Sequence, residues 1–196
     1  MEARELRRMS FEEYRALEES SDELWEYVSG EAWAITSARP EHNLVARNAL
    51  VALTVALRGK RCVPYPERQK IATPAGGYHY ADASVICGPA TRDQRDAHAI
   101  TNPVVIVEVL SPTTADYDRG GKFAHYRTIA SLREYVVVDV DGRRVEHHAR
   151  LETGQWLMTE LSSGTLELAA IEVAIPLAEL WIDLDPAVIG TAVTGV

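Results

Sequence analysis

A carboxylate interrupts one of the most apolar stretches of the chain. The segment "VVIVEVL" (104–110) has the branched side chains of a strand that is buried on both faces, yet it contains Glu108. A carboxylate that leaves water must be paired, bind a metal or give up its charge. Two structural explanations stay open: Glu108 could lie at the solvated end of its strand, just before Ser111, or it could pair with an arginine. The functional alternative is that Glu108 binds a metal.

A second acid has a similar setting. The segment "YHYADASVIC" (78–87) places Asp82 between Tyr80 and the apolar pair Val85 and Ile86. If this strand and the 104–110 strand are neighbours in a sheet, the two carboxylates can converge on one point. Two hard oxygen donors, completed by a backbone carbonyl and water, suit Mg²⁺. The sequence therefore predicts a Mg²⁺ site that Mn²⁺ could also occupy.

Lys122 is the third candidate for chemistry. It lies fourteen positions after Glu108, on a helix predicted to begin soon after the glutamate strand ends. Its ammonium group could therefore reach the same point, where it could orient or deprotonate an attacking water, or offset charge that builds on a phosphate. The structural alternative is a solvated ion pair with Asp118, one helical turn earlier, which contributes only tenths of a kcal/mol.

Local patterns predict the elements that must position these side chains. "MSFEEYRALEES" (9–20) has Ser10 and Glu13 at capping-box spacing, which predicts a short amphipathic helix over 10–20. "DELWEYVSGEAWAIT" (22–36) predicts two strands that turn at Ser29 and Gly30. "PEHNLVARNALVALTVALRG" (40–59) predicts a long helix, whose buried face we expect to comprise Leu44, Val45, Ala49, Leu53 and Val55.

The rest of the chain alternates between strands and short helices. The patterns predict strands over 62–72, 78–87 and 104–110, a helix over 117–130, a hairpin over 134–150 with its turn at Asp141 and Gly142, strands over 156–161 and 165–168, and a helical turn over 176–180. This order favours an α/β or α+β fold with a central mixed β-sheet and helices on its faces.

Length and composition limit the class of protein. With 196 residues, 46% of them hydrophobic, we expect one domain over 1–196 rather than two small ones, with a peripheral C-terminal tail over 183–196. No apolar run reaches the roughly 18 residues of a membrane span, and the N-terminal segment has no leader pattern, so we expect a cytoplasmic protein without membrane contact. Cys62 and Cys87 are too few for a disulfide framework or a four-cysteine zinc site, and we expect both to be reduced.

Asp82, Glu108 and Lys122 together resemble the PD-(D/E)XK nuclease superfamily. The segment "IVEVLSPTTADYDRGGKFAHY" (106–126) is similar to the core motif of the bacterial Uma-type family of restriction-endonuclease-like proteins, and "LWEYVSGEAW", "SARPEHNLVARNAL" and "EYVVVDVDGRRVEHH" extend the likeness over most of the chain. The resemblance implies a restriction-endonuclease-like core. It implies that Asp82 and Glu108 are metal ligands, that the carbonyl of Val109 is a third donor, and that Lys122 is the catalytic lysine.

Two positions depart from the usual superfamily pattern. The lysine is usually two residues after the glutamate on the same strand, where this chain has Leu110, so Lys122 must reach the site from the helix. The residue before the aspartate is usually proline, and here it is Ala81. Proline at that position shapes the backbone and binds nothing, so neither departure removes a ligand.

Glu31 and His42 match positions that recur near the site in this family. Glu31 follows the Gly30 turn and could supply a further acid, and His42 lies in the first turn of the long helix, where it could contact a phosphate or transfer a proton. The alternative for both is a solvated polar residue at a turn or a helix start.

Two functions follow as hypotheses. The first is a Mg²⁺-dependent endonuclease that hydrolyses phosphodiester bonds in DNA, acts as a homodimer, and contacts phosphates through a basic rim of Arg92, Arg95, Arg119, Lys122 and Arg127. The second is a catalytically silent nuclease fold that uses an acidic surface to bind proteins. The net charge of −9 favours the second hypothesis, and the retained acids and lysine favour the first.

Overall fold

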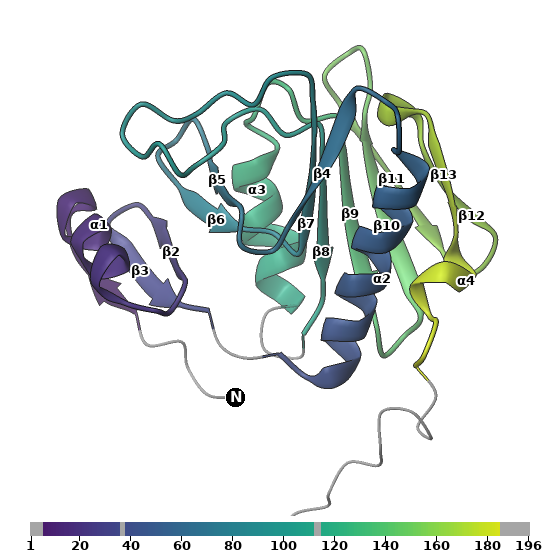
Figure 1. The fold of residues 1–196 in the computed structure, drawn as a ribbon, viewed down its shortest axis with the longest axis horizontal. Helices are drawn as coiled ribbons and strands as arrows, with labels where there is room; N and C mark the ends of the chain where they lie inside the picture. The colour runs from purple at the N-terminus through teal and green to yellow at the C-terminus, as the bar shows by residue number, and fades with distance from the viewer. Residues whose placement is uncertain (1–5, 36–37, 112–114, 185–196) are drawn as a thin grey trace, which may run out of the picture.

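A six-stranded mixed sheet forms the centre of the computed structural model, which describes residues 6–35, 38–111 and 115–184 (Figure 1). The strand order is β11-β10-β9-β8-β7-β4, with bounds of Trp156–Leu161, Arg144–Arg150, Glu134–Asp139, Val105–Val109, Ala83–Cys87 and Cys62–Pro66. Neighbouring strands are antiparallel except for β8 and β9, which are parallel and are joined by the helical segment that carries Lys122.

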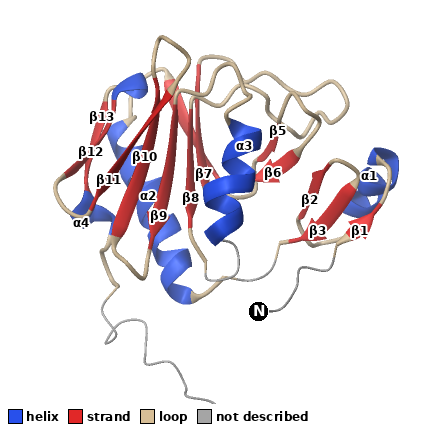
Figure 2. Cartoon of the chain, turned by 180° about the vertical axis from the view of Figure 1, so that it is seen from behind, coloured by secondary structure: helices blue, strands red, loops and turns tan. Residues whose placement is uncertain are grey.

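Helical segments cover both faces of this sheet. Figures 1 and 2 show α2 on one face, and the helical turn η1 followed by α3 on the other. The bounds are Pro40–Ala56 for α2, Tyr117–Lys122 for η1 and Phe123–Tyr126 for α3. A two-stranded sheet, with β12 (Thr165–Leu168) and β13 (Val173–Pro176), packs on the α2 side together with η2 (Ala169–Ile171) and α4 (Leu177–Leu180). The predicted mixed α/β fold with a central sheet between helices is confirmed.

A second, five-stranded sheet lies beside the central one. Its order is β1-β3-β2-β6-β5, with bounds of Arg7–Arg8, Glu31–Ala34, Trp25–Val28, Tyr78–Tyr80 and Lys70–Ala72. The helix α1 (Phe11–Ser20) packs on it, and the predicted capping box between Ser10 and Glu13 is present. The predicted hairpin turn at Ser29 and Gly30 joins β2 to β3. Only Ala81 and Asp82 separate β6 from β7, so Asp82 lies where the chain passes from one sheet to the other.

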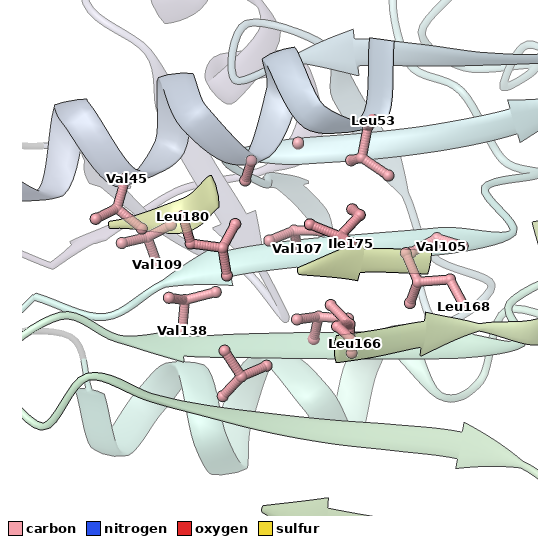
Figure 3. Packing of buried hydrophobic residues seen from close by; sticks show 14 of the residues in the cluster. Val45, Leu53, Val105, Val107, Val109, Val138, Leu166, Leu168, Ile175 and Leu180 are labelled. Carbon is pink, nitrogen blue, oxygen red and sulfur yellow. The ribbon is translucent and has the colours of Figure 1, made fainter. Parts of the chain in front are cut away.

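Alternation along β8 assigns its side chains to the two faces of the central sheet. Val105, Val107 and Val109 belong to the core under α2, where Figure 3 shows them packed among residues of α2, β12, β13 and α4. Ile106 and Leu110 belong to the core under α3. Each such side chain contributes about 1.5–3 kcal/mol when fully buried. Glu108 has the same parity as Ile106, and it therefore faces α3.

Several helix predictions need correction. The helix predicted over 117–130 is a π-helical turn, η1, followed by a single α-helical turn, α3. Along α2, Val45, Ala49 and Leu53 are buried as predicted, but Val55 is 60% exposed because it lies on a different side of the helix from those buried residues.

Among the described residues, no helix is both long and apolar enough to cross a membrane.

The prediction that Cys62 and Cys87 are reduced is wrong. The two residues are direct partners in the antiparallel pairing of β4 with β7, and they form a disulfide. The two Cα atoms lie 4.0 Å apart because the strand register brings them together. The number of cysteines in the sequence carries no information about that register, so it could not predict the bond.

The C-terminal segment predicted to be peripheral is described only at its start. Leu184 is buried in the core under α2, and Asp183 pairs with Arg47 of that helix at 2.9 Å. Residues 185–196 lie outside the described residues. That 1–196 forms one cooperative domain stays a prediction.

Candidate functional site

Glu108 is buried on the α3 face of the central sheet. Its side chain is 4% exposed, and both carboxylate oxygens accept hydrogen bonds from the Lys122 ammonium, at 3.1 and 3.2 Å. The Tyr126 hydroxyl donates a further bond to Oε1, at 3.1 Å. Glu108 therefore does not lie at a solvated strand end, and the partner of its carboxylate is a lysine rather than an arginine.

The π-helical turn η1 carries Lys122 to this position. Gly121 makes the turn possible here, because a Cβ on that residue would lie 2.4 Å from the Tyr117 ring. In a π-helical turn each backbone hydrogen bond spans five residues instead of four, which changes the direction of the side chains that follow. Such turns are frequent at functional sites. Lys122 thus reaches Glu108 from η1 rather than from β8.

Lys122 is surrounded by oxygen atoms. Besides Glu108, its Nζ lies 3.2 Å from Glu26 Oε1, 3.6 Å from Asp118 Oδ1 and 3.1 Å from the carbonyl oxygen of Tyr80. The pair with Asp118 is present, as the structural alternative supposed, but both residues are buried and the contact is one of four. We call Lys122, Glu26, Glu108 and Asp118 the Lys122 cluster.

Asp82 lies directly beside Glu108 in the sheet. Ala83 pairs with Val107, and the register places Asp82 opposite Glu108 one step beyond that pair. The Val109 amide donates to Asp82 Oδ2 at 2.7 Å. His42 of α2 approaches the same oxygen, with Nε2 at 3.6 Å, and the two side chains are 12% and 13% exposed. Asp82 and His42 thus form the partly open edge of the site, while the Lys122 cluster forms its buried part.

Glu31 lies outside the site, whereas Glu26, five residues earlier in the sequence, contacts Lys122. Glu31 lies in β3 next to β1, and its carboxylate pairs with Arg8 at 3.4 Å, so we do not include it in the site. Glu26 is 1% exposed, and its Oε1 accepts a hydrogen bond from the Tyr80 amide at 3.1 Å as well as contacting Lys122. Sequence analysis missed Glu26, although the signal was the one used for Glu108: an acid flanked by large apolar residues, here Trp25 and Tyr27.

Buried negative charge exceeds buried positive charge in the Lys122 cluster. Burial raises the pKa of Glu108 well above its ordinary value despite the nearby ammonium, and Asp118, Asp82 and Glu26 raise it further. Burial would also raise the pKa of Glu26, but the Lys122 charge, His79 and the Tyr80 amide together outweigh burial and lower that pKa to about 2. Burial opposes the charge on Lys122, yet Glu108, Glu26 and Asp118 outweigh burial and raise the pKa of Lys122 well above its ordinary value. The surrounding carboxylates therefore favour the charged form of Lys122.

The donor set next to this cluster fits a hard divalent cation. Asp82 and Glu108 supply carboxylate oxygens, and the backbone of Val109 runs between them. In the described part of the chain, no three acidic, histidine or cysteine side chains converge as a metal cluster. Mg²⁺ accepts such a set because it binds through one or two carboxylates and retains several waters. A cation would also offset the excess negative charge of the cluster.

Three of the five residues predicted to form a basic rim are buried or already have partners. Lys122 is buried, Arg119 pairs with Glu146 at 2.6 Å and Asp139 at 3.4 Å, and Arg95 lies over the Phe11 ring beside α1. Charge pairing and ring stacking already use these guanidinium groups. We therefore assign no nucleic-acid surface to this set.

Comparisons with known proteins agree with this architecture. A solved structure from Anabaena variabilis, described as "a putative nuclease belonging to DUF820", superposes with a TM-score of 0.68 over 82% of this chain and 91% of that one, at 12% identity, which supports the fold alone. Two Synechocystis proteins, sll1609 and slr1290, are 35% and 32% identical over 80% and 84% of this chain, which is 89% and 86% of their own lengths.

The family comparison covers nearly all of the described chain. Residues 11–184 match the model of the Uma2 family, which is described as "Putative restriction endonuclease". The match includes β2, which carries Glu26, the Asp82 junction, the Glu108 strand and the turn with Lys122. The resemblance noted from "IVEVLSPTTADYDRGGKFAHY" is thereby confirmed. This chain belongs to the Uma2 family of restriction-endonuclease-like proteins.

Proposed function

We propose that the protein is a Mg²⁺-dependent endonuclease that hydrolyses phosphodiester bonds in DNA. The observation that carries the proposal is the meeting of Asp82, Glu108 and Lys122 at one place, with more buried carboxylates than one ammonium can balance. Three carboxylates surround the single ammonium of Lys122. Excess acid beside a partly open edge supports the binding of a divalent cation.

Each residue has a distinct role in this proposal. Asp82, Glu108 and the Val109 carbonyl would hold Mg²⁺, which supplies Lewis acidity and lowers the pKa of a bound water. Lys122 would orient the attacking water or help to deprotonate it, and would offset charge on the phosphate. His42, at the open edge beside Asp82, is placed to contact the phosphate.

Plasmid cleavage tests this function directly. We expect the purified protein to nick or linearise supercoiled plasmid in Mg²⁺ or Mn²⁺ but not in EDTA, and Asp82→Ala to lower the rate by about 10²–10³-fold. The matched control is Asp22→Ala, at an exposed aspartate near α1. A single-stranded RNA substrate in parallel reactions tests the choice of nucleic acid. Equal rates for the wild type and Asp82→Ala would refute the role of the site.

A silent binding domain is the second candidate, because the net charge of −9 suits an acidic protein-binding surface better than a nucleic-acid surface. It predicts no cleavage and no rise in melting temperature on addition of Mg²⁺ or Mn²⁺. The nuclease proposal predicts a rise that Asp82→Ala abolishes, since a ligand that binds only the folded state stabilises it.

Assembly and location complete the proposal. A two-fold homodimer would present one site to each strand of a duplex, and sedimentation equilibrium of the full chain measures its mass. We place the protein in the cytoplasm, where DNA is accessible. Cell fractionation with an antibody against the chain tests that location.

A further inference from the structure

His79 is a buried histidine with no part in the proposed reaction. It lies in β6 between Tyr78 and Tyr80, and its side chain is 0% exposed. Neither ring nitrogen has a hydrogen-bond partner among the described residues, and Glu26 Oε2 is also buried without one. Buried polar atoms rarely lack partners in folded proteins, so both groups call for an explanation.

The unbonded atoms of His79 and Glu26 face each other. His79 Nδ1 lies 3.9 Å from Glu26 Oε2, so a shift of less than 1 Å would bring the two atoms within hydrogen-bond distance. The other oxygen of Glu26 already contacts Lys122 and the Tyr80 amide. A donor on Oε2 would therefore fix the orientation of the whole carboxylate.

The surroundings of the ring leave it little freedom. The Tyr126 ring lies against it at 5.2 Å in an edge arrangement, and the His125 ring lies at 5.3 Å. On the opposite side, Nε2 lies close to Gly77, where a Cβ would come within 2.9 Å of it. Tyr126 donates its hydroxyl hydrogen to Glu108, so His79 lies beside both Glu26 and the tyrosine that holds Glu108.

We infer that His79 is a positioning residue for the catalytic lysine, because its Nδ1–H donates to Glu26 Oε2 and so holds Glu26 against Lys122. The effect of this contact on cleavage rests on the proposed nuclease function, whereas the contact itself does not. His79 touches neither of the proposed metal ligands Asp82 and Glu108. Its influence on the reaction is transmitted through the Glu26 carboxylate.

Nitrogen NMR tests the contact without reference to activity. The full chain, labelled with ¹⁵N-histidine, should show His79 with a protonated Nδ1, and Glu26→Gln should shift this signal while Asp22→Ala leaves it unchanged. A neutral His79 with its proton on Nε2, or a signal that ignores Glu26→Gln, overturns the inference. The tautomer in the wild type decides the matter even if Glu26→Gln fails to fold.

Cleavage kinetics test the consequence. An asparagine amide can replace Nδ1 and a glutamine amide can replace Nε2, so we expect His79→Asn to retain most activity. We expect His79→Gln to lower kcat by about 10-fold with little change in KM, in the range found for partners of active-site ligands. His98→Asn, at an exposed histidine, is the control.

The NMR test and the kinetic test can contradict different parts of the proposal. Equal losses in His79→Asn and His79→Gln show that the ring only fills space, which overturns the positioning role. If the wild type cleaves no nucleic acid, the nuclease proposal fails, and the NMR result alone decides whether His79 holds Glu26.

Discussion

Two lysines of this chain are buried among carboxylates, and they differ in how well their charges are balanced. The first lysine, Lys70, contacts Glu18 and Asp96, and the Tyr80 hydroxyl donates a hydrogen bond to Glu18 at 2.8 Å. We call these four residues the Lys70 cluster. In the Lys122 cluster, three carboxylates share one ammonium. The two clusters meet at Tyr80, because its side chain belongs to the first while its amide and carbonyl contact Glu26 and Lys122.

One acid from each cluster shows the difference, because the pKa values of Asp96 and Glu108 shift in opposite directions. Burial would raise the pKa of Asp96, but its bonds to Lys70 and the His98 amide outweigh burial and lower that pKa. Burial raises the pKa of Glu108 well above its ordinary value, and Lys122 does not compensate for it. The Lys70 cluster is thus arranged to stabilise α1 and the loop that follows β7, whereas the Lys122 cluster retains the kind of unfavourable charge that functional sites often contain.

The largest expected effect is on the Lys70 cluster. Lys70→Met leaves Glu18 and Asp96 buried without their cation, so we expect the free energy of unfolding to fall by about 3–5 kcal/mol. Urea unfolding monitored by tryptophan fluorescence measures the change. Lys60→Met, at an exposed lysine, is the control and should change stability by less than about 0.5 kcal/mol. A loss below about 1 kcal/mol for Lys70→Met would mean that this cluster does not support the fold.

Removing an acid from the unbalanced cluster should have the opposite sign. Glu108→Gln keeps the shape of the side chain and relieves repulsion from Glu26 and Asp118, so we expect the metal-free protein to gain of the order of 1 kcal/mol while cleavage is lost. Urea unfolding in EDTA and plasmid cleavage in Mg²⁺ measure the two effects. Asp96→Asn is the matched variant in the other cluster, and it should destabilise. If both variants destabilise equally, the proposed difference between the clusters is incorrect.

The same pair of variants should differ in pH dependence. Because the pKa of Glu108 is raised above its ordinary 4.5, the folded state binds more protons than the unfolded state above that pH, and stability falls as pH rises toward the folded value. Because the pKa of Asp96 is lowered from 3.8, its stabilisation is complete above that pH and is lost as pH falls through the folded value. Glu108→Gln should therefore remove a loss of stability on the alkaline side, and Asp96→Asn a loss on the acid side.

Urea titrations in EDTA at a series of pH values from 3 to 9 compare the slopes of stability against pH for the wild type and both variants. If Glu108→Gln leaves the slope above pH 4.5 unchanged, the buried carboxyl does not hold an extra proton in the folded state.

The smallest expected effect concerns one hydroxyl. Tyr126→Phe removes the bond to Glu108 Oε1, which Lys122 also binds, so we expect a loss of about 0.5–1.5 kcal/mol in stability. Tyr135→Phe is the matched control, because the Tyr135 hydroxyl is equally buried but bonds to the Asp118 carbonyl. The two variants should lose similar stability, and Tyr126→Phe should reduce cleavage more. A larger loss of cleavage in Tyr135→Phe would argue that Tyr126 does not orient Glu108.

The sequence predictions were accurate for features that depend on neighbours close in the sequence, and less accurate for features that depend on distant residues. The capping box at Ser10, the turn at Ser29 and Gly30, and the strand that carries Glu108 depend on neighbours a few residues away, and all three were predicted correctly. The reduced state of Cys62 and the continuous helix through Lys122 were expectations about distant neighbours or unusual backbone. The structure corrected each of them.

By itself, the sequence determined which residues could do chemistry: acids at Asp82 and Glu108 among residues that favour buried strands, and a lysine on the next helical segment. Only the tertiary structure showed that Glu26, on a separate sheet and 96 residues before Lys122, completes the cluster and that Glu31 does not. The physical reason is that alternation along a strand gives the parity of a side chain but not what lies opposite it. The packing of the second, five-stranded sheet beside η1 and the central sheet decided whether Glu26 faced water or the lysine.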